Sequence, residues 1–237
     1  MTPIKERPIL FSAPMVRAIL EGRKTVTRRA VRAGFNPDDL EGTLSASECR
    51  KLYRELPQHF GASYFCPCGQ PGDRLWVRET FALLGNEDGC CIDWQDNLVK
   101  GDERGAARIY RASCPPGDYG LNQIPAKAEW KPDTESMEYD GAWRPSIHMP
   151  RWASRILLEI TDVRVERLHD ITEEQARAEG VRLYTDHAEL GDWWHVEGIE
   201  TYSADPRKSF ELLWSSVGGD WGANPWVWVV EFKRVTP

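Results

Sequence analysis

The segment GRKTVTRR, at residues 22–29, carries the densest set of chemically unusual side chains in the sequence. A threonine hydroxyl such as that of Thr27 becomes a nucleophile only when a base within about 2.6–3.2 Å removes its proton. Lys24 could be that base if burial lowered its pKa by several units. The residue types therefore permit nucleophilic chemistry at Lys24 and Thr27, although a threonine in a β-branched run is more commonly just a strand former.

Two stretches of the sequence are basic and contain no carboxylate. They cover residues 22–32 and 143–155, in a chain whose net charge is −7. Solvated strand faces would explain either stretch alone, but two of them in an acidic chain favour an anion or nucleotide site. The negative net charge argues against a protein that coats long nucleic acid, because such proteins are basic overall.

Local signals predict the elements that must position these residues. Pro14 in the first turn and Gly22 after the last predict a helix at residues 13–21. Thr172 and Gln175 form a capping box that opens a helix of residues 173–179, ended by Gly180. Further helices are expected at residues 47–55 and 205–217, and strands at residues 25–27, 74–81, 107–112, 156–168 and 226–234. Short β segments without βαβ alternation predict an α+β fold, a small mixed β-barrel with short helices.

The segment at residues 22–29 resembles the ASCH family, whose signature is G-x-K-x-x-T-x-R directly after the first helix. Gly22, Lys24, Thr27 and Arg29 match it. The turn at residues 72–73, the segment DITEEQARAEG after the long strand and the aromatic closing strand agree in order. The resemblance covers roughly half of the chain and implies a PUA-like barrel. It is closest to the larger phage and prophage members, as a single domain of residues 1–237 with insertions at about 33–70, 85–142 and 184–204.

The resemblance also implies an activity. Small bacterial members of the family include amidohydrolases that remove the acyl group from N4-acetylcytidine with a lysine, a threonine and a glutamate. These roles carry over to Lys24, Thr27 and Glu179, with Glu173 or Glu174 as the fallback for the glutamate. Two assignments stay open. In one, neutral Lys24 is the base and Glu179 shuttles the proton to the leaving amine. In the other, charged Lys24 stabilises the oxyanion and Glu179 is the base.

Further side chains are expected to bind the substrate. Arg29 would hold a phosphate, a sugar hydroxyl or the cytosine O2, and a tryptophan would stack on the base. The other candidates line a proline-bounded loop or end a strand; the full set is Arg29, Trp76, Glu79, His148, Arg151 and Trp152. Each has an ordinary structural alternative, since a tryptophan in a barrel is usually part of the core.

Three functions follow from these features. The first is hydrolysis of the N4-acyl amide of a cytidine-type nucleoside. The second is non-catalytic binding of RNA or of a modified base, and the third is an ASCH-type ribonuclease in which Lys24 holds the phosphate. The acidic net charge favours a small nucleoside over long RNA as the partner.

The remaining predictions concern cofactors and location. The six cysteines lack the paired C-x₂-C spacing of a zinc site, so we expect free thiols, no metal and no cofactor. The sequence contains no signal peptide and no apolar run of the ~18 residues that a membrane span requires. We therefore expect a cytoplasmic protein with no membrane partner. The sequence leaves the oligomeric state open, with a monomer favoured.

Overall fold

The computed structural model describes residues 4–31, 66–84, 90–95, 97–101, 103–113, 143–184 and 191–236. The chain divides into two compact units, which we treat separately. Unit 1 comprises Met1–Arg7, Ala18–Leu75 and Leu157–Thr236, and unit 2 comprises Pro8–Arg17 and Trp76–Ile156. Within the described ranges, no helix is long and apolar enough to cross a membrane.

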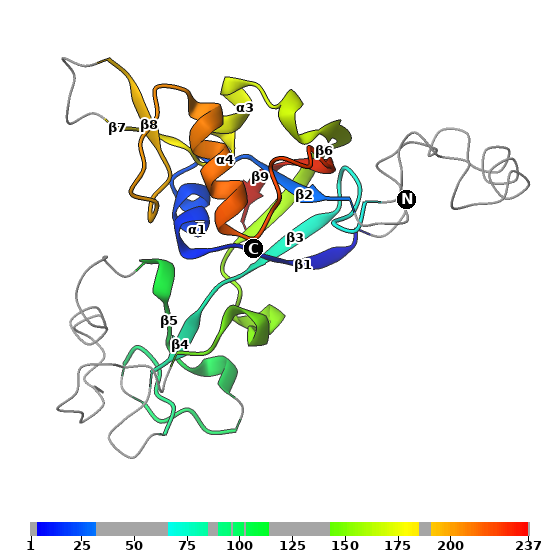
Figure 1. Cartoon of the computed structure of the whole chain (residues 1–237). Coiled ribbons are helices and arrows are strands. Elements are labelled where there is room, and N and C mark those ends of the chain that lie inside the picture. The colour runs from blue at the N-terminus through cyan, green and yellow to red at the C-terminus, as the bar shows by residue number, and fades with distance from the viewer. Residues whose placement is uncertain are drawn as a thin grey trace, which may run out of the picture. The chain divides into compact units, whose positions relative to one another are not determined.

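The fold is α+β, as predicted, and its largest element is a five-stranded sheet (Figure 1). The strand order is β1-β3-β6-β9-β2, so that β1 and β2 are the edges. The strands are β1 Glu6–Leu10, β2 Val26–Ala30, β3 Arg74–Arg78, β6 Leu157–Arg167 and β9 Trp226–Val235. The described strands form an open sheet and do not close into a barrel.

The two faces of this sheet differ in chemistry, and the register assigns residues to each face. Arg28 of β2 pairs with Val229 of β9, and Val229 pairs with Arg164 of β6. The neighbouring row joins Thr27, Val230 and Val163. Because successive residues of a strand point to opposite faces, the arginine row and the threonine row lie on opposite sides of the sheet.

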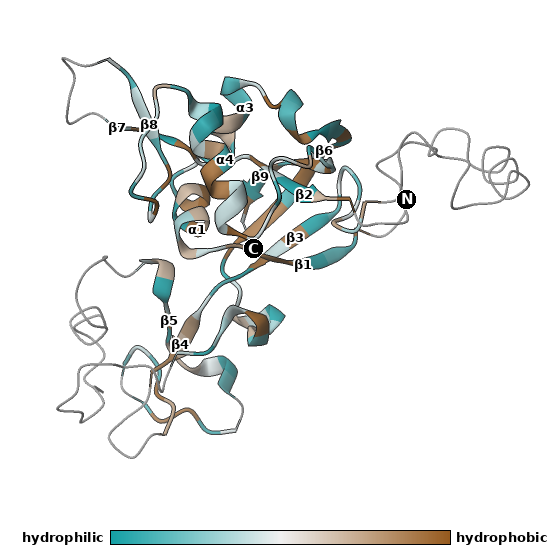
Figure 2. Cartoon of the chain, viewed as in Figure 1, coloured by the Kyte–Doolittle hydropathy of each residue, from teal (hydrophilic) through white to brown (hydrophobic). Residues whose placement is uncertain are grey.

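Three of the predicted helices are confirmed. The first, α1, spans Ala13–Leu20, and Gly22 follows it with a φ of 76°. The second, α3, spans Glu173–Ala178, and its capping box has both hydrogen bonds. The third, α4, spans Pro206–Ser216 and begins where the Asp205 side chain accepts from the Arg207 amide at 2.8 Å. Figure 2 shows α3 mostly in the teal of polar residues. The helix expected at residues 47–55 lies outside the described residues.

The strand predicted at residues 74–81 is instead two strands. After β3 the chain leaves the large sheet, and β4 (Phe81–Leu83) pairs with β5 (Arg108–Tyr110) in unit 2. Alternation alone could not reveal this break, because both pieces carry similar apolar residues. Short 3₁₀ helices complete unit 2: Glu103–Gly105, Arg111–Ser113, Ser146–His148 and Arg151–Ala153.

A two-stranded hairpin occupies part of the region expected as the third insertion. Strands β7 (Arg182–Tyr184) and β8 (Trp193–His195) pair antiparallel. A hydrogen bond of 2.8 Å from Ser209 Oγ of α4 to the Trp194 carbonyl fixes β8 against this helix. The hairpin therefore has a defined position within unit 1.

Candidate functional site

The structure brings Lys24 and Glu179 together, as the sequence predicted. Lys24 Nζ lies 2.5 Å from Glu179 Oε2, although the two residues are 155 positions apart. The pair is closed off from solvent, with the Lys24 side chain 0% and the Glu179 side chain 3% exposed. Both belong to unit 1.

Backbone contacts hold this pair in place. The amides of Arg23 and Lys24 both donate to the Ala18 carbonyl, at 2.9 and 3.0 Å, so the chain turns sharply after α1. The Thr25 amide then donates to the Ala178 carbonyl at 2.9 Å, which joins the start of β2 to the end of α3. Lys24 and Glu179 meet because these two chain segments are tied together directly beside them.

Gly180 is required where the two segments approach. Its φ is 107°, a left-handed conformation that disfavours side chains, and a Cβ there would lie 3.2 Å from Ala18 Cβ and 3.7 Å from Lys24 Cβ. The glycine in the A-E-G helix end thus lets the carboxylate of Glu179 reach the lysine.

The hydrogen bonds of Lys24 match a charged ammonium group. Nζ donates to Glu179 Oε2, to the Glu179 carbonyl at 2.9 Å and to the Val26 carbonyl at 2.8 Å. An ammonium has three N–H donors for these three acceptors, whereas a neutral amine has only two. The pKa of Lys24 is lowered, first by burial and further by the charges of Arg29 and Arg28, whereas the Glu179 carboxylate opposes this by attracting and hydrogen-bonding the charged form. We conclude that the geometry favours the assignment in which Lys24 is charged.

Arg28 is a third member of the site, and the sequence analysis did not single it out. Its Nη1 lies 3.2 Å from Glu179 Oε1, and its Nη2 donates to Gln175 Oε1 at 2.8 Å and approaches Glu166 Oε2 at 3.3 Å. The signal in the sequence was its place in the acid-free basic stretch of residues 22–32, beside the motif residues Lys24 and Arg29.

The three side chains form a buried charge cluster that depends on all its members. Two cations flank one carboxylate, and Glu166 adds a second, partly exposed carboxylate. Removing one partner of a buried ion pair generally costs about 3–5 kcal/mol, because it leaves an uncompensated charge. The cluster can hold or transfer a proton, and it can stabilise a developing negative charge.

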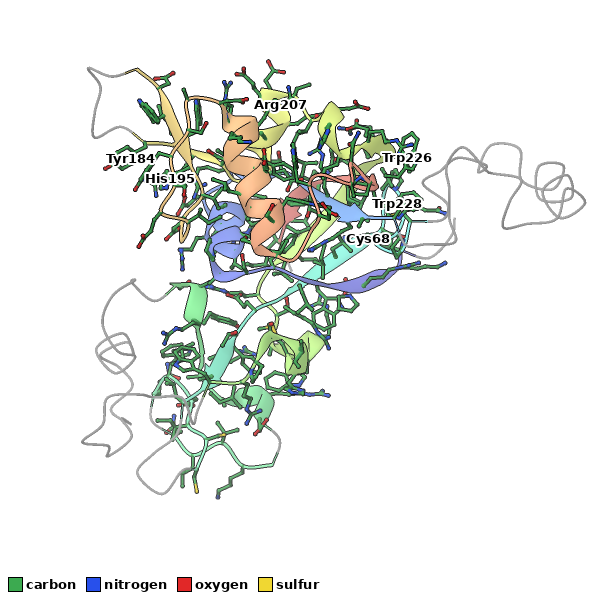
Figure 3. All side chains as sticks on the ribbon, in the orientation of Figure 1. Cys68, Tyr184, His195, Arg207, Trp226 and Trp228 are labelled. Atoms are coloured by element: carbon green, nitrogen blue, oxygen red, sulfur yellow. The ribbon has the colours of Figure 1, made fainter. Side chains whose placement is uncertain are left out.

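Thr27 and Arg29 lie on the opposite face of β2 from this cluster. Thr27 is buried and pairs with Val230, whereas Arg29 is half-buried and pairs with Trp228. The charge of Arg29 lowers the pKa of Cys68. Cys68 and Trp228 are labelled in Figure 3. The fallback glutamates are exposed, and Glu173 pairs with Arg177 at 3.1 Å. Of the three glutamates proposed, Glu179 is the one at the lysine.

The other predicted binding residues lie in unit 2. Glu79 is buried, and both its carboxylate oxygens accept from Arg155 at 2.9 Å. The Arg155 guanidinium also lies 4.0 Å from the Tyr110 ring centre. This arrangement gives Glu79 a structural partner inside unit 2.

The remaining predicted binding residues of unit 2 differ in exposure. Trp76 is buried with Arg78 over its ring, and Trp152 is half-buried with Arg108 over its ring, at 5.0 and 5.8 Å. His148 is exposed and Arg151 is half-buried. Both tryptophans thus already carry a stacked guanidinium.

No group of three or more His, Cys, Asp or Glu side chains in the described ranges could hold a metal ion. Cys66, Cys68 and Cys91 form no disulfide, and Cys49 and Cys114 lie outside the described residues. Comparisons with protein-family models, with curated proteins and with solved structures found no match.

Proposed function

We propose that this chain is an amide hydrolase that removes the N4-acyl group from N4-acylcytidine-type nucleosides. The observation that carries the proposal is the buried contact of 2.5 Å between Lys24 Nζ and Glu179 Oε2. The ASCH-like signature and the A-E-G helix end were paired on sequence alone, and the structure brings these two residues within hydrogen-bond reach.

The proposal includes the family's PUA-like fold. The five-stranded sheet, with α1 leading into β2 and β6 leading into α3, supports it. In a PUA-like barrel these strands would form the wall, and the edge strands β1 and β2 would have to be joined to close it.

The proposed reaction uses water as the nucleophile. Glu179 removes a proton from a water molecule as the water oxygen attacks the acyl carbon, and Lys24 and Arg28 stabilise the tetrahedral oxyanion. Collapse breaks the C–N bond, and the proton held by Glu179 passes to the departing N4 amine. The products are the cytidine nucleoside and a carboxylic acid. Thr27, on the other face of β2, has no role in this route.

Variants of three residues test this assignment. Glu179→Gln keeps the shape but removes the base, so hydrolysis of N4-acetylcytidine should fall by at least about a hundredfold, the lower end of what general bases contribute. Thr27→Ala should retain most of the turnover. Glu174→Gln, a substitution at an exposed residue of α3, is the matched control. Turnover is followed by the ultraviolet shift to cytidine, and circular dichroism verifies that each variant is folded.

The outcomes separate the two routes. Loss of turnover in Thr27→Ala with retained activity in Glu179→Gln would replace this route by a covalent one through Thr27. Equal activity of Glu179→Gln and Glu174→Gln would remove Glu179 from the chemistry.

A second function is favoured by one observation, the complete enclosure of the pair. Lys24 has 0% side-chain exposure and uses its three donors within the protein. A non-catalytic protein that binds modified bases or RNA needs the buried charge cluster only to support its binding surface. Such a protein would bind N4-acetylcytidine without converting it, which calorimetric titration beside the ultraviolet assay distinguishes.

A further inference from the structure

An open pocket of about 620 Å³ lies in unit 1 beside the buried pair. Its walls come from the turn after α1, the end of α3 and the β7–β8 hairpin, and they include Gly22, Thr25 and Ala178, which are near neighbours in sequence of Lys24 and Glu179. Small-molecule sites in proteins generally have volumes of about 300–1,000 Å³. The pocket thus has the size of a site for a small organic ligand.

Three guanidinium groups line this pocket, which we call the arginine pocket. They belong to Arg23, Arg177 and Arg182, and the acidic side chain among the lining residues is Glu21. Glu21 already accepts from Arg23 Nε at 2.7 Å. Glu173, outside the lining, pairs with Arg177 at 3.1 Å. With both carboxylates counted, the three arginines still leave an excess of positive charge, in a chain whose net charge is −7. An anion is the ligand that such a lining attracts.

Two of the guanidinium groups are held in position. Arg23 Nη1 donates to the Gly180 carbonyl at 3.0 Å, and the Arg177 guanidinium lies 4.5 Å from the Trp194 ring centre. Arg177 Nε is buried and has no hydrogen-bond partner.

The third guanidinium belongs to an exposed residue of the hairpin. Within the described part of unit 1, no carboxylate pairs with Arg182. Its strand partner is His195, whose pKa is lowered first by burial and then by the charge of Arg182. The Glu197 carboxylate opposes this lowering, and the charge of Arg23 adds to it. His195 and Tyr184 project from the same hairpin face, with ring centres 5.7 Å apart (Figure 3). By the same register Leu183 and Trp194 lie on the hairpin face opposite Arg182. The pocket lining includes residues of both faces, and Leu183 and Trp194 supply its apolar part.

We propose that the arginine pocket binds a nucleoside monophosphate. Its phosphate lies among Arg23, Arg177 and Arg182, and its base lies against Leu183 and Trp194. Arginine matches the geometry of phosphate oxygens through paired N–H donors, and an aromatic wall suits any nucleobase. The bounded volume and the acidic chain favour a small ligand over RNA. This inference goes beyond amide hydrolysis, because binding here needs neither an acyl group nor turnover.

Calorimetric titration with cytidine 5′-monophosphate, cytidine and orthophosphate tests the inference. The monophosphate should bind at least about tenfold more tightly than either fragment, because cytidine lacks the charge-assisted contacts to phosphate and orthophosphate lacks the contacts to the base. Raising the salt concentration should weaken the binding. Arg182→Gln should weaken it about tenfold or more, whereas Arg234→Gln, an exposed residue of β9 outside the pocket, should leave it unchanged. Arg177→Gln provides a second pocket variant, and thermal melting verifies folding.

Several results would overturn the inference. Equal affinity for cytidine and its monophosphate would exclude a phosphate site, and equal affinity for orthophosphate would exclude a role for the base. Equal effects of Arg182→Gln and Arg234→Gln would place binding elsewhere. A short single-stranded RNA that binds far more tightly than the monophosphate would replace a nucleotide pocket by an RNA surface. None of these outcomes depends on whether N4-acetylcytidine is hydrolysed.

Discussion

A buried lysine at the end of a short motif is the residue on which the proposed chemistry depends. The sequence indicated that Lys24 and Glu179 act together, because a family resemblance linked two positions that local pattern could not link. It could not determine the protonation of Lys24, which depends on acceptors such as the Val26 carbonyl. It also could not identify Arg28, whose partners lie on α3 and β6.

Cys68 supplies a prediction at this same scale. Its pKa is lowered to about 7, first by a hydrogen bond from the Cys66 thiol and further by the charges of Arg29 and Arg7. The same hydrogen bond and burial raise the pKa of Cys66. Because the thiolate is the nucleophile, iodoacetamide should modify Cys68 with a rate that is half-maximal near pH 7, while Cys66 stays unmodified.

Peptide mass spectrometry after timed labelling measures both rates. Cys66→Ala, which removes the thiol donor, should shift the Cys68 profile toward higher pH and serves as the test of cause. A Cys68 rate that rises only around pH 8.5, where an ordinary cysteine ionises, would contradict the prediction.

At the scale of elements, capping and turn residues predicted the helices, and alternation predicted the long strands. The helices α1 and α3 were predicted from Pro, Gly and capping-box positions, and the long strands β6 and β9 from alternation. The break between β3 and β4 and the β7–β8 hairpin were not, because three-residue strands carry too little pattern and depend on their pairing partners.

The meeting of α3 with the turn after α1 gives a prediction about an element end. Gly180→Ala places a methyl group at a φ of 107° and 3.2 Å from Ala18 Cβ. Gly218→Ala, at a φ of 84° with nothing within 4 Å of its Cβ, carries only the backbone cost. That cost is about 1–2 kcal/mol, and crowding adds roughly 1–3 kcal/mol at Gly180. Urea unfolding should therefore show the larger loss for Gly180→Ala. Equal losses would mean that the close approach adds no strain.

For the whole molecule, composition and pattern predicted an α+β chain, which the structure confirms. They could not divide the chain into two units, because its boundaries fall inside β1, α1 and β3 and leave no linker-like composition. The single-domain organisation, the PUA-like barrel and the amide hydrolase remain predictions of the resemblance.

Hydrolysis of N4-acetylcytidine by the unmodified protein in H₂¹⁸O tests the central claim most directly. Attack of water on the acyl carbon predicts cytidine without label and acetate carrying one ¹⁸O atom, both read by mass spectrometry. The wild-type protein should produce them in equal amounts, and Glu179→Gln should produce neither at a comparable rate. Absence of turnover by the wild-type protein, or ¹⁸O in a uridine product formed by attack on the base, would contradict the account.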